Sequence, residues 1–166
     1  MRKRIDPIEE SLFRRAHAVV RSSRATAQCQ QDMTASRGRK RNYTYEALFT
    51  VAMITALEGY GELLLSDIAQ TVRRLTPTQR EVLGIAHDWS YDLVEQAVAE
   101  LGAAMKETVE PETGEVIEPR LKMTLAEFMT SMASDVIPTQ IACSDTQAID
   151  STDYEAYSRR RSWKHP

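Results

Sequence analysis

The sequence predicts a mainly α-helical protein, with a bundle of five or six helices over residues 5–135 and one short strand beyond it. The chain has 166 residues, of which 42% are hydrophobic and 27% charged, so it is large enough to bury a core. Residues 76–79 and 124–127 each carry a Thr-x-x-Gln/Glu capping box, a pattern that starts a helix. Apolar residues also recur at helical spacing, as at Leu64, Ile68, Val72 and Leu75.

The first predicted helix covers residues 7–31 and is amphipathic. At about 100° per residue, Arg14, Arg21 and Arg24 lie on the side opposite the apolar Leu12. We expect the apolar side to pack on the rest of the domain and the basic side to face DNA. The alternative interpretation is an amphipathic helix with an ordinary charged face.

Positive charge is concentrated at the two ends of the chain. Residues 1–41 hold 11 Lys and Arg against 4 Asp and Glu, whereas residues 42–166 hold 10 against 20. Basic ends of this kind commonly contact phosphate, although each can also be a solvated segment. The DNA-binding candidates in these ends, beyond the first helix, are Arg37, Arg39, Lys40, Arg41, Arg159, Arg160 and Arg161.

Four more helices are predicted in the middle of the chain. Residues 43–58 are apolar on nearly every side, which is typical of a helix in the centre of a bundle. A helix over residues 63–75 has Ser66 as the cap of its regular part, and a short helix follows over residues 76–84. Ser90 caps the next helix, whose apolar stripe consists of Val94, Ala97, Val98, Leu101 and Met105.

Residues 107–120 are acidic and contain two prolines, and they predict an exposed connection. The Glu-Thr-Gly sequence at residues 112–114, flanked by valine and isoleucine, favours a small hairpin. Its carboxylates are interpreted as solvated rather than catalytic. Thr124 then opens a helix to about Ser134, whose predicted buried side consists of Leu125, Phe128, Met129 and Met132.

Several classes of site and location lack their sequence patterns. Cys29 and Cys143 fit no zinc or redox spacing, and the three histidines are scattered along the chain. No Ser–His–Asp set or glycine-rich phosphate loop stands out. The longest apolar run, residues 48–57, falls short of the roughly 18 residues that a membrane span needs. We therefore expect a cytoplasmic protein that makes no membrane contact.

Residues 148–153, Ala-Ile-Asp-Ser-Thr-Asp, have the pattern of a metal-binding strand. Asp150 directly follows apolar strand residues, and Asp153 comes three residues later. Phosphodiester cleavage by two metal ions needs carboxylates that converge from different elements, and an aspartate on a strand is a rigid first ligand. Taken alone, this pattern also suits an ordinary turn at the end of a strand.

Together with segments before it, this block resembles insertion-sequence transposases of the DDE superfamily, actinobacterial in style. The resemblance implies a ribonuclease-H-like core, whose first strand carries Asp150 as the catalytic acid and Mg²⁺ ligand, with Asp153 as a second candidate ligand. Ser151 departs from the pattern, in which a glycine often follows the first aspartate. The earlier segments, in the same order as in that family, are residues 38–41, 48–57, 63–68, 75–85, 90–94 and 133–138.

The resemblance also implies a division into parts and a partner. Residues 1–36 form a basic helical arm, residues 37–135 a helical DNA-binding domain, and residues 136–166 the start of an incomplete ribonuclease-H-like domain. The other two acids of the triad are expected beyond residue 166, so we expect a truncated chain with no complete active site and no cofactor of its own. Double-stranded DNA is the expected partner, and two protomers are expected to pair as a homodimer.

Two other functions are compatible with the sequence. Residues 75–83 resemble the opening of the helix-turn-helix domain of response regulators, which would make the chain a stand-alone DNA-binding regulator. The helix after them is acidic, however, and phosphate would repel it. Alternatively, the striped helices serve a protein partner, in which case polar substitutions at Leu93, Val94 or Leu101 would abolish the interaction.

Overall fold

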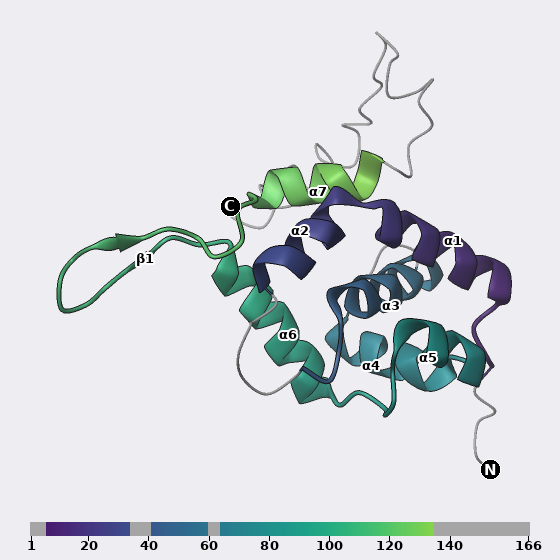
Figure 1. Ribbon diagram of the computed structural model, residues 1–166. Helices are drawn as coiled ribbons and strands as arrows, with labels where there is room; N and C mark the ends of the chain where they lie inside the picture. The colour runs from purple at the N-terminus through teal and green to yellow at the C-terminus, as the bar shows by residue number, and fades with distance from the viewer. Residues whose placement is uncertain (1–5, 34–40, 60–63, 135–166) are drawn as a thin grey trace, which may run out of the picture. The chain divides into compact units, whose positions relative to one another are not determined.

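The computed structural model describes residues 6–33, 41–59 and 64–134. The chain divides into two compact units, residues 1–136 and 137–166, and every described residue belongs to the first. The mainly helical fold predicted from the sequence is confirmed (Figure 1). The elements are α1 (Glu10–Ser22), α2 (Arg24–Met33), α3 (Tyr45–Glu58), α4 (Leu65–Arg74), α5 (Pro77–Leu83), α6 (Tyr91–Ala104), β1 (Thr108–Val109), β2 (Val116–Ile117) and α7 (Leu125–Ser134).

Helix α3 lies at the centre of this unit, as its apolar sequence predicts. It packs against α1, α2 and α4, and its buried residues point to several sides of the helix. Thr44 caps it by accepting a hydrogen bond from the backbone N–H of Ala47 at 3.0 Å. Its Phe49 ring meets Phe128 of α7 edge to face, with centroids 5.2 Å apart, so α7 is joined to the same core.

The prediction of a single helix over residues 7–31 is wrong, because the helix is interrupted at Ser23, which separates α1 from α2. Ser23 is buried and extended, with ψ 129°, and its hydroxyl accepts the backbone N–H of Ala25. The same N–H also reaches the hydroxyl of Ser131, at 3.0 Å. Serine competes for backbone groups in this way, so Ser23 ends one helix and begins the next. Phe13 and Ala16 of α1 are nevertheless buried in the core that surrounds α3.

The helix starts predicted in the middle of the chain are confirmed at Thr76 and Ser90. Thr76 and Gln79 form the complete capping box of α5, which ends at Gly84 with φ 66°. Ser90 caps α6 by accepting the N–H of Leu93 at 3.2 Å. The cap predicted at Ser66 is wrong, because α4 begins at Leu65 and the Ser66 hydroxyl donates to the carboxylate of Asp67 instead.

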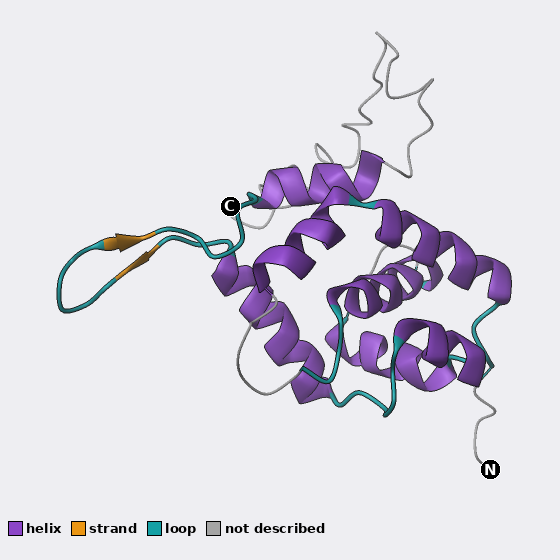
Figure 2. Cartoon of the chain, in the orientation of Figure 1, coloured by secondary structure: helices purple, strands orange, loops and turns teal. Residues whose placement is uncertain are grey.

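The acidic segment forms the predicted hairpin, which extends away from the helices (Figure 2). Strands β1 and β2 pair antiparallel, with Thr108 opposite Ile117 and Val109 opposite Val116. Gly114 adopts φ 70° within the connection, which favours a residue without a Cβ.

Helix α7 begins at the predicted capping box. The Glu127 carboxylate accepts the N–H of Thr124 at 2.8 Å, and Thr124 accepts the N–H of Glu127. The predicted buried side is wrong in part: Leu125 and Met129 are exposed, whereas Phe128 and Met132 pack on the core. Helix α7 packs chiefly against α2, so only one of its faces is covered. Val98 of α6 is also exposed, on an outer helix of the same kind. The predicted strand near residue 149 lies outside the described residues.

Candidate nucleic-acid interface

Helix α1 presents arginines on the side away from the core. Phe13, Ala16 and Val20 are buried, whereas Arg14, Arg15 and Arg21 are all exposed. Because Arg14 and Arg21 are seven residues apart, they point within about 20° of each other, roughly 10 Å apart along the axis. The arrangement agrees with the amphipathic pattern of the sequence, and it places two of the predicted DNA-binding residues on one line.

Arg14 differs from its neighbours because it has an ion-pair partner. Its Nε lies 2.7 Å from a carboxylate oxygen of Glu10, one turn earlier. The hydrogen bond from Arg14 lowers the pKa of Glu10, with a second contribution from Gln79, so that Glu10 is charged at neutral pH. An exposed pair of this kind contributes little to stability, and it reduces the net charge that α1 presents around Arg14.

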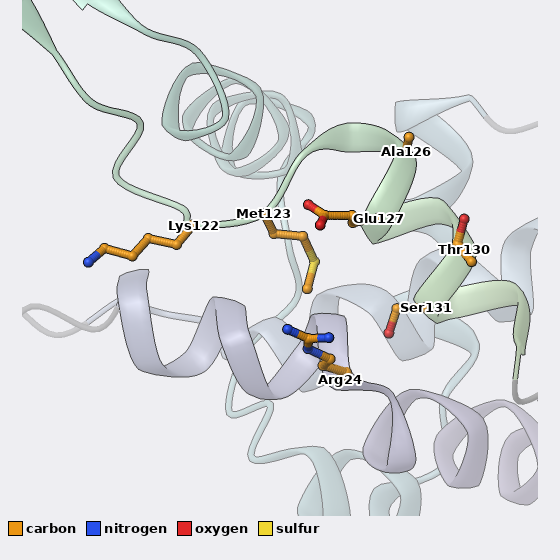
Figure 3. A pocket seen from close by; sticks show the side chains of 7 residues that line it. All are labelled: Arg24, Lys122, Met123, Ala126, Glu127, Thr130 and Ser131. Carbon is orange, nitrogen blue, oxygen red and sulfur yellow. The ribbon is translucent and has the colours of Figure 1, made fainter.

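Arg24 begins α2 and lines a cleft of about 420 Å³ between α2 and α7. Figure 3 shows its guanidinium group on the α2 side of the cleft, below Met123 and Glu127, whereas Lys122 extends outward from the loop that leads into α7. Glu127 is held in the capping box, and the hydrogen bonds from the backbone and side chain of Thr124 lower its pKa. The cleft therefore holds two cations and one anion.

A second depression, of about 380 Å³, lies among α1, α2 and the start of α3. Arg21, Thr26 and Glu46 are among its lining residues. The Thr26 hydroxyl is buried and has no hydrogen-bond partner among the described residues. Glu46 is engaged by His17, whose Nε2 lies 2.6 Å from the carboxylate. Arg21 is thus the cation that this depression offers to an anion.

Arg41, which the sequence assigns to DNA, is occupied within the fold. Its guanidinium donates to the backbone carbonyl of Met33 at 2.5 Å and lies 3.3 Å from the carboxylate of Glu100. It also lies over the Tyr45 ring, 5.6 Å from the centroid. Its side chain is only 27% exposed. Arg41 therefore joins the end of α2 to α3 and α6, a role that a basic sequence cluster does not reveal.

Other cations are likewise paired with acids. Arg74 forms a bidentate pair with Glu58, at 2.5 and 2.9 Å, which links α4 to α3. Arg80 donates to Asp88 at 2.6 Å and to the backbone carbonyl of Val72. These arginines stabilise the packing of α3, α4 and α5, and they are not part of the basic surface.

The cations that remain without an ion pair gather around α1 and α2. Among the described residues, Lys and Arg side chains with no carboxylate within 4.0 Å are Arg15, Arg21, Arg24, Lys106, Arg120 and Lys122. Arg120 donates to the backbone carbonyls of Asp32 and Met33 at the end of α2, and the backbone N–H of Lys122 donates to the Asp32 carboxylate at 3.0 Å. We call the set Arg15, Arg21, Arg24, Arg120 and Lys122 the basic surface.

Sequence reasoning missed Arg120 and Lys122, because they follow an acidic segment and show no local basic pattern. The remaining predicted site residues are not brought into this surface by the described part of the structure. Several of them lie outside the described residues, namely Asp150, Asp153, Arg37, Arg39, Lys40 and Arg159 to Arg161. Within residues 6–33, 41–59 and 64–134, no group of three or more His, Cys, Asp or Glu side chains is placed to hold a metal ion.

The comparisons identify no relative: no family model, curated protein or solved structure matches the chain. In the part of the chain that the structure describes, every helix falls short of the length or apolar character needed to cross a membrane.

Proposed function

We propose that this protein binds double-stranded DNA through the basic surface, as the amino-terminal region of a DDE-type transposase. The observation that carries the proposal is the position of the cations without an ion pair. The described residues hold 11 Lys and Arg against 18 Asp and Glu, yet five of the six such cations lie on or against α1 and α2. Because carboxylates outnumber cations among the described residues, the lack of ion pairs at this surface favours binding of an external anion there.

Phosphate is the anion that such a surface suits best. Arginine and lysine side chains on helices contact the DNA backbone and fix the register of a protein without reading sequence. The clefts beside Arg21 and Arg24 place cations in depressions, where a phosphate oxygen gains more than on an open surface. The basic residues 37–40 follow α2 in the sequence and are further candidates for phosphate contact in this proposal.

The transposase part of the proposal rests on the resemblance carried by residues 148–157. Asp150 is the first acid of the triad in this proposal, and Asp153 is the second candidate ligand; in an intact enzyme they would hold Mg²⁺, which supplies the Lewis acid for phosphodiester chemistry. The described helices would bind the ends of the element in the cytoplasm. A helix-turn-helix regulator is less favoured, because α6 carries Asp92, Glu95 and Glu100 and no lysine or arginine.

The test is DNA binding by Arg15→Ala/Arg21→Ala compared with a control, Arg73→Ala/Lys106→Ala, which removes two exposed cations outside the basic surface. Each lost phosphate contact reduces the slope of log K against log salt by about 0.9, so the first variant should lose about 1.8 from the slope. The control should keep the slope of the wild-type chain. Fluorescence anisotropy with a labelled duplex at several salt concentrations measures both. Equal slopes for the two variants, or no binding by the wild-type chain, would refute the proposal.

A further inference from the structure

The β1–β2 hairpin exposes apolar side chains on both of its faces. By the pairing of the strands, Val109 and Val116 share one face, and Ile117 lies on the other. Their exposed fractions are 61%, 58% and 49%. A two-stranded hairpin with no covered face is at best marginally stable in water, because it buries too little apolar surface to offset the ordering of its backbone.

Its charges make the isolated hairpin less favourable still. Glu110 and Glu115 face each other at the end of the ladder, where the backbone N–H of Glu110 donates to the carbonyl of Glu115 at 2.9 Å. Continuing the register in the other direction places Glu107 opposite Glu118. Like charges directly opposite on paired strands are destabilising. Both the apolar side chains and the carboxylates would gain from a surface that offers cations beside apolar groups.

We propose that the hairpin is a docking arm, and that its occupant is a second copy of this chain. The chain itself carries the complementary surface. Arg24 and Lys122 line the cleft between α2 and α7, together with the apolar Met123 and Ala126. The hairpin of one protomer docks there on its partner through the face that carries Glu110, Glu115 and Ile117, with the carboxylates against the cations and the isoleucine against the apolar side chains.

If the two protomers exchange hairpins reciprocally, the assembly is a closed dimer with no free docking site. Each protomer then gives one hairpin and receives one, so the two contacts are related by a two-fold axis and form a closed dimer. Opposite charges on the two contact regions set the orientation and speed the encounter. The inference does not depend on DNA binding, since the charge and apolar complementarity lie within the chain.

A charge-swap experiment tests this assembly. The first variant, Glu110→Lys/Glu115→Lys, reverses the hairpin, and the second, Arg24→Glu/Lys122→Glu, reverses the cleft. The control, Glu81→Lys/Glu95→Lys, reverses two exposed acids on α5 and α6. Sedimentation velocity over a range of protein concentrations measures association, and circular dichroism checks that each variant is folded. Arg24→Gln/Lys122→Gln replaces the second variant if that one fails to fold.

The expected result is a dimer for the wild-type chain and the control, and association weakened at least about tenfold for each reversed variant alone. An equimolar mixture of the two reversed variants should associate again, because both hairpin contacts then pair opposite charges. The proposal is overturned if the wild-type chain is monomeric throughout, or if the hairpin variant associates as well as the control. Failure of the mixture to associate overturns the choice of the α2–α7 cleft as the docking surface.

Discussion

Gln79 is the position at which the sequence motif and the structure predict different effects of one substitution. As the fourth residue of a capping box, Gln79 accepts the backbone N–H of Thr76 through Oε1 at 3.0 Å. Glutamate fills this position equally well in capping boxes, so the motif alone predicts that Gln79→Glu is neutral. In the structure, however, Nε2 of Gln79 also donates to the backbone carbonyl of Ile8, at 3.2 Å, and to the carboxylate of Glu10, at 3.1 Å.

The expected loss follows from these contacts. Gln79 is buried, and a glutamate in its place keeps the bond to Thr76 but has no proton to donate at neutral pH. The loss of the bond to the Ile8 carbonyl, which is then left unpaired, and the burial of an uncompensated charge together cost about 3–5 kcal/mol. Repulsion from Glu10 increases the loss. By contrast, Thr76→Ala removes only the cap and costs about 1 kcal/mol.

Urea unfolding followed by circular dichroism measures both variants. The deficit of Gln79→Glu should also depend on pH, because burial beside Glu10 raises the pKa of the new carboxyl above its unfolded value of about 4.3. The neutral form is retained below that value, and the deficit grows as pH rises through the raised pKa. If Gln79→Glu unfolds within about 0.5 kcal/mol of the wild-type chain at pH 7, these hydrogen bonds do not hold the segment before α1, and the reasoning is refuted.

Three further predictions concern single residues. Burial, and then the nearby Asp32, raise the pKa of the Cys29 thiol to about 12. In a Cys143→Ser background, Cys29 should therefore react with a thiol reagent far more slowly in the folded chain than in the urea-unfolded chain. Equal rates would contradict its burial. The hydrogen bond from Gln28, and then that from the Lys122 backbone, lower the pKa of Asp32. Asp32→Ala should therefore lose stability at pH 7, and this loss should shrink as pH falls below the ordinary pKa of about 3.9 and through the lowered one; a loss that does not change with pH would point to a different cause. Gly84 adopts φ 66° at the end of α5, so Gly84→Ala should lower the unfolding free energy by about 1 kcal/mol, as measured by thermal unfolding, whereas an unchanged midpoint would mean that the turn relaxes.

Local signals explain what the sequence predicted correctly. The capping residues Thr76, Ser90 and Thr124 act through backbone groups within three residues, so their sequence pattern is sufficient to locate α5, α6 and α7. The hairpin is a local structure too, set by Gly114 and the residues around it. The apolar composition of α3 likewise indicated its central position.

Long-range contacts explain what the sequence did not reveal. The break at Ser23 is completed by Ser131, which is more than 100 residues away in the chain. Arg41 resembles its neighbours in a basic cluster, yet Met33 and Glu100 hold it inside the fold. Arg120 and Lys122 belong to the basic surface only because Asp32 and Met33 at the end of α2 bind that segment. None of these relations has a spacing that could be found along the sequence.

The distribution of ion pairs separates structural from functional charge more clearly than composition does. Arg41, Arg74 and Arg80 are partly buried, and each binds both a carboxylate and a backbone carbonyl, as expected of cations that hold helices together. Arg15 and Arg21 are exposed and meet no carboxylate among the described residues, in a chain where acids outnumber bases. Net charge alone gives no indication of a DNA partner, whereas the gathering of cations without an ion pair on α1 and α2 favours one. A polyanion can therefore bind at Arg15 and Arg21, and the acidic hairpin of a second protomer is an anionic partner that the chain itself supplies.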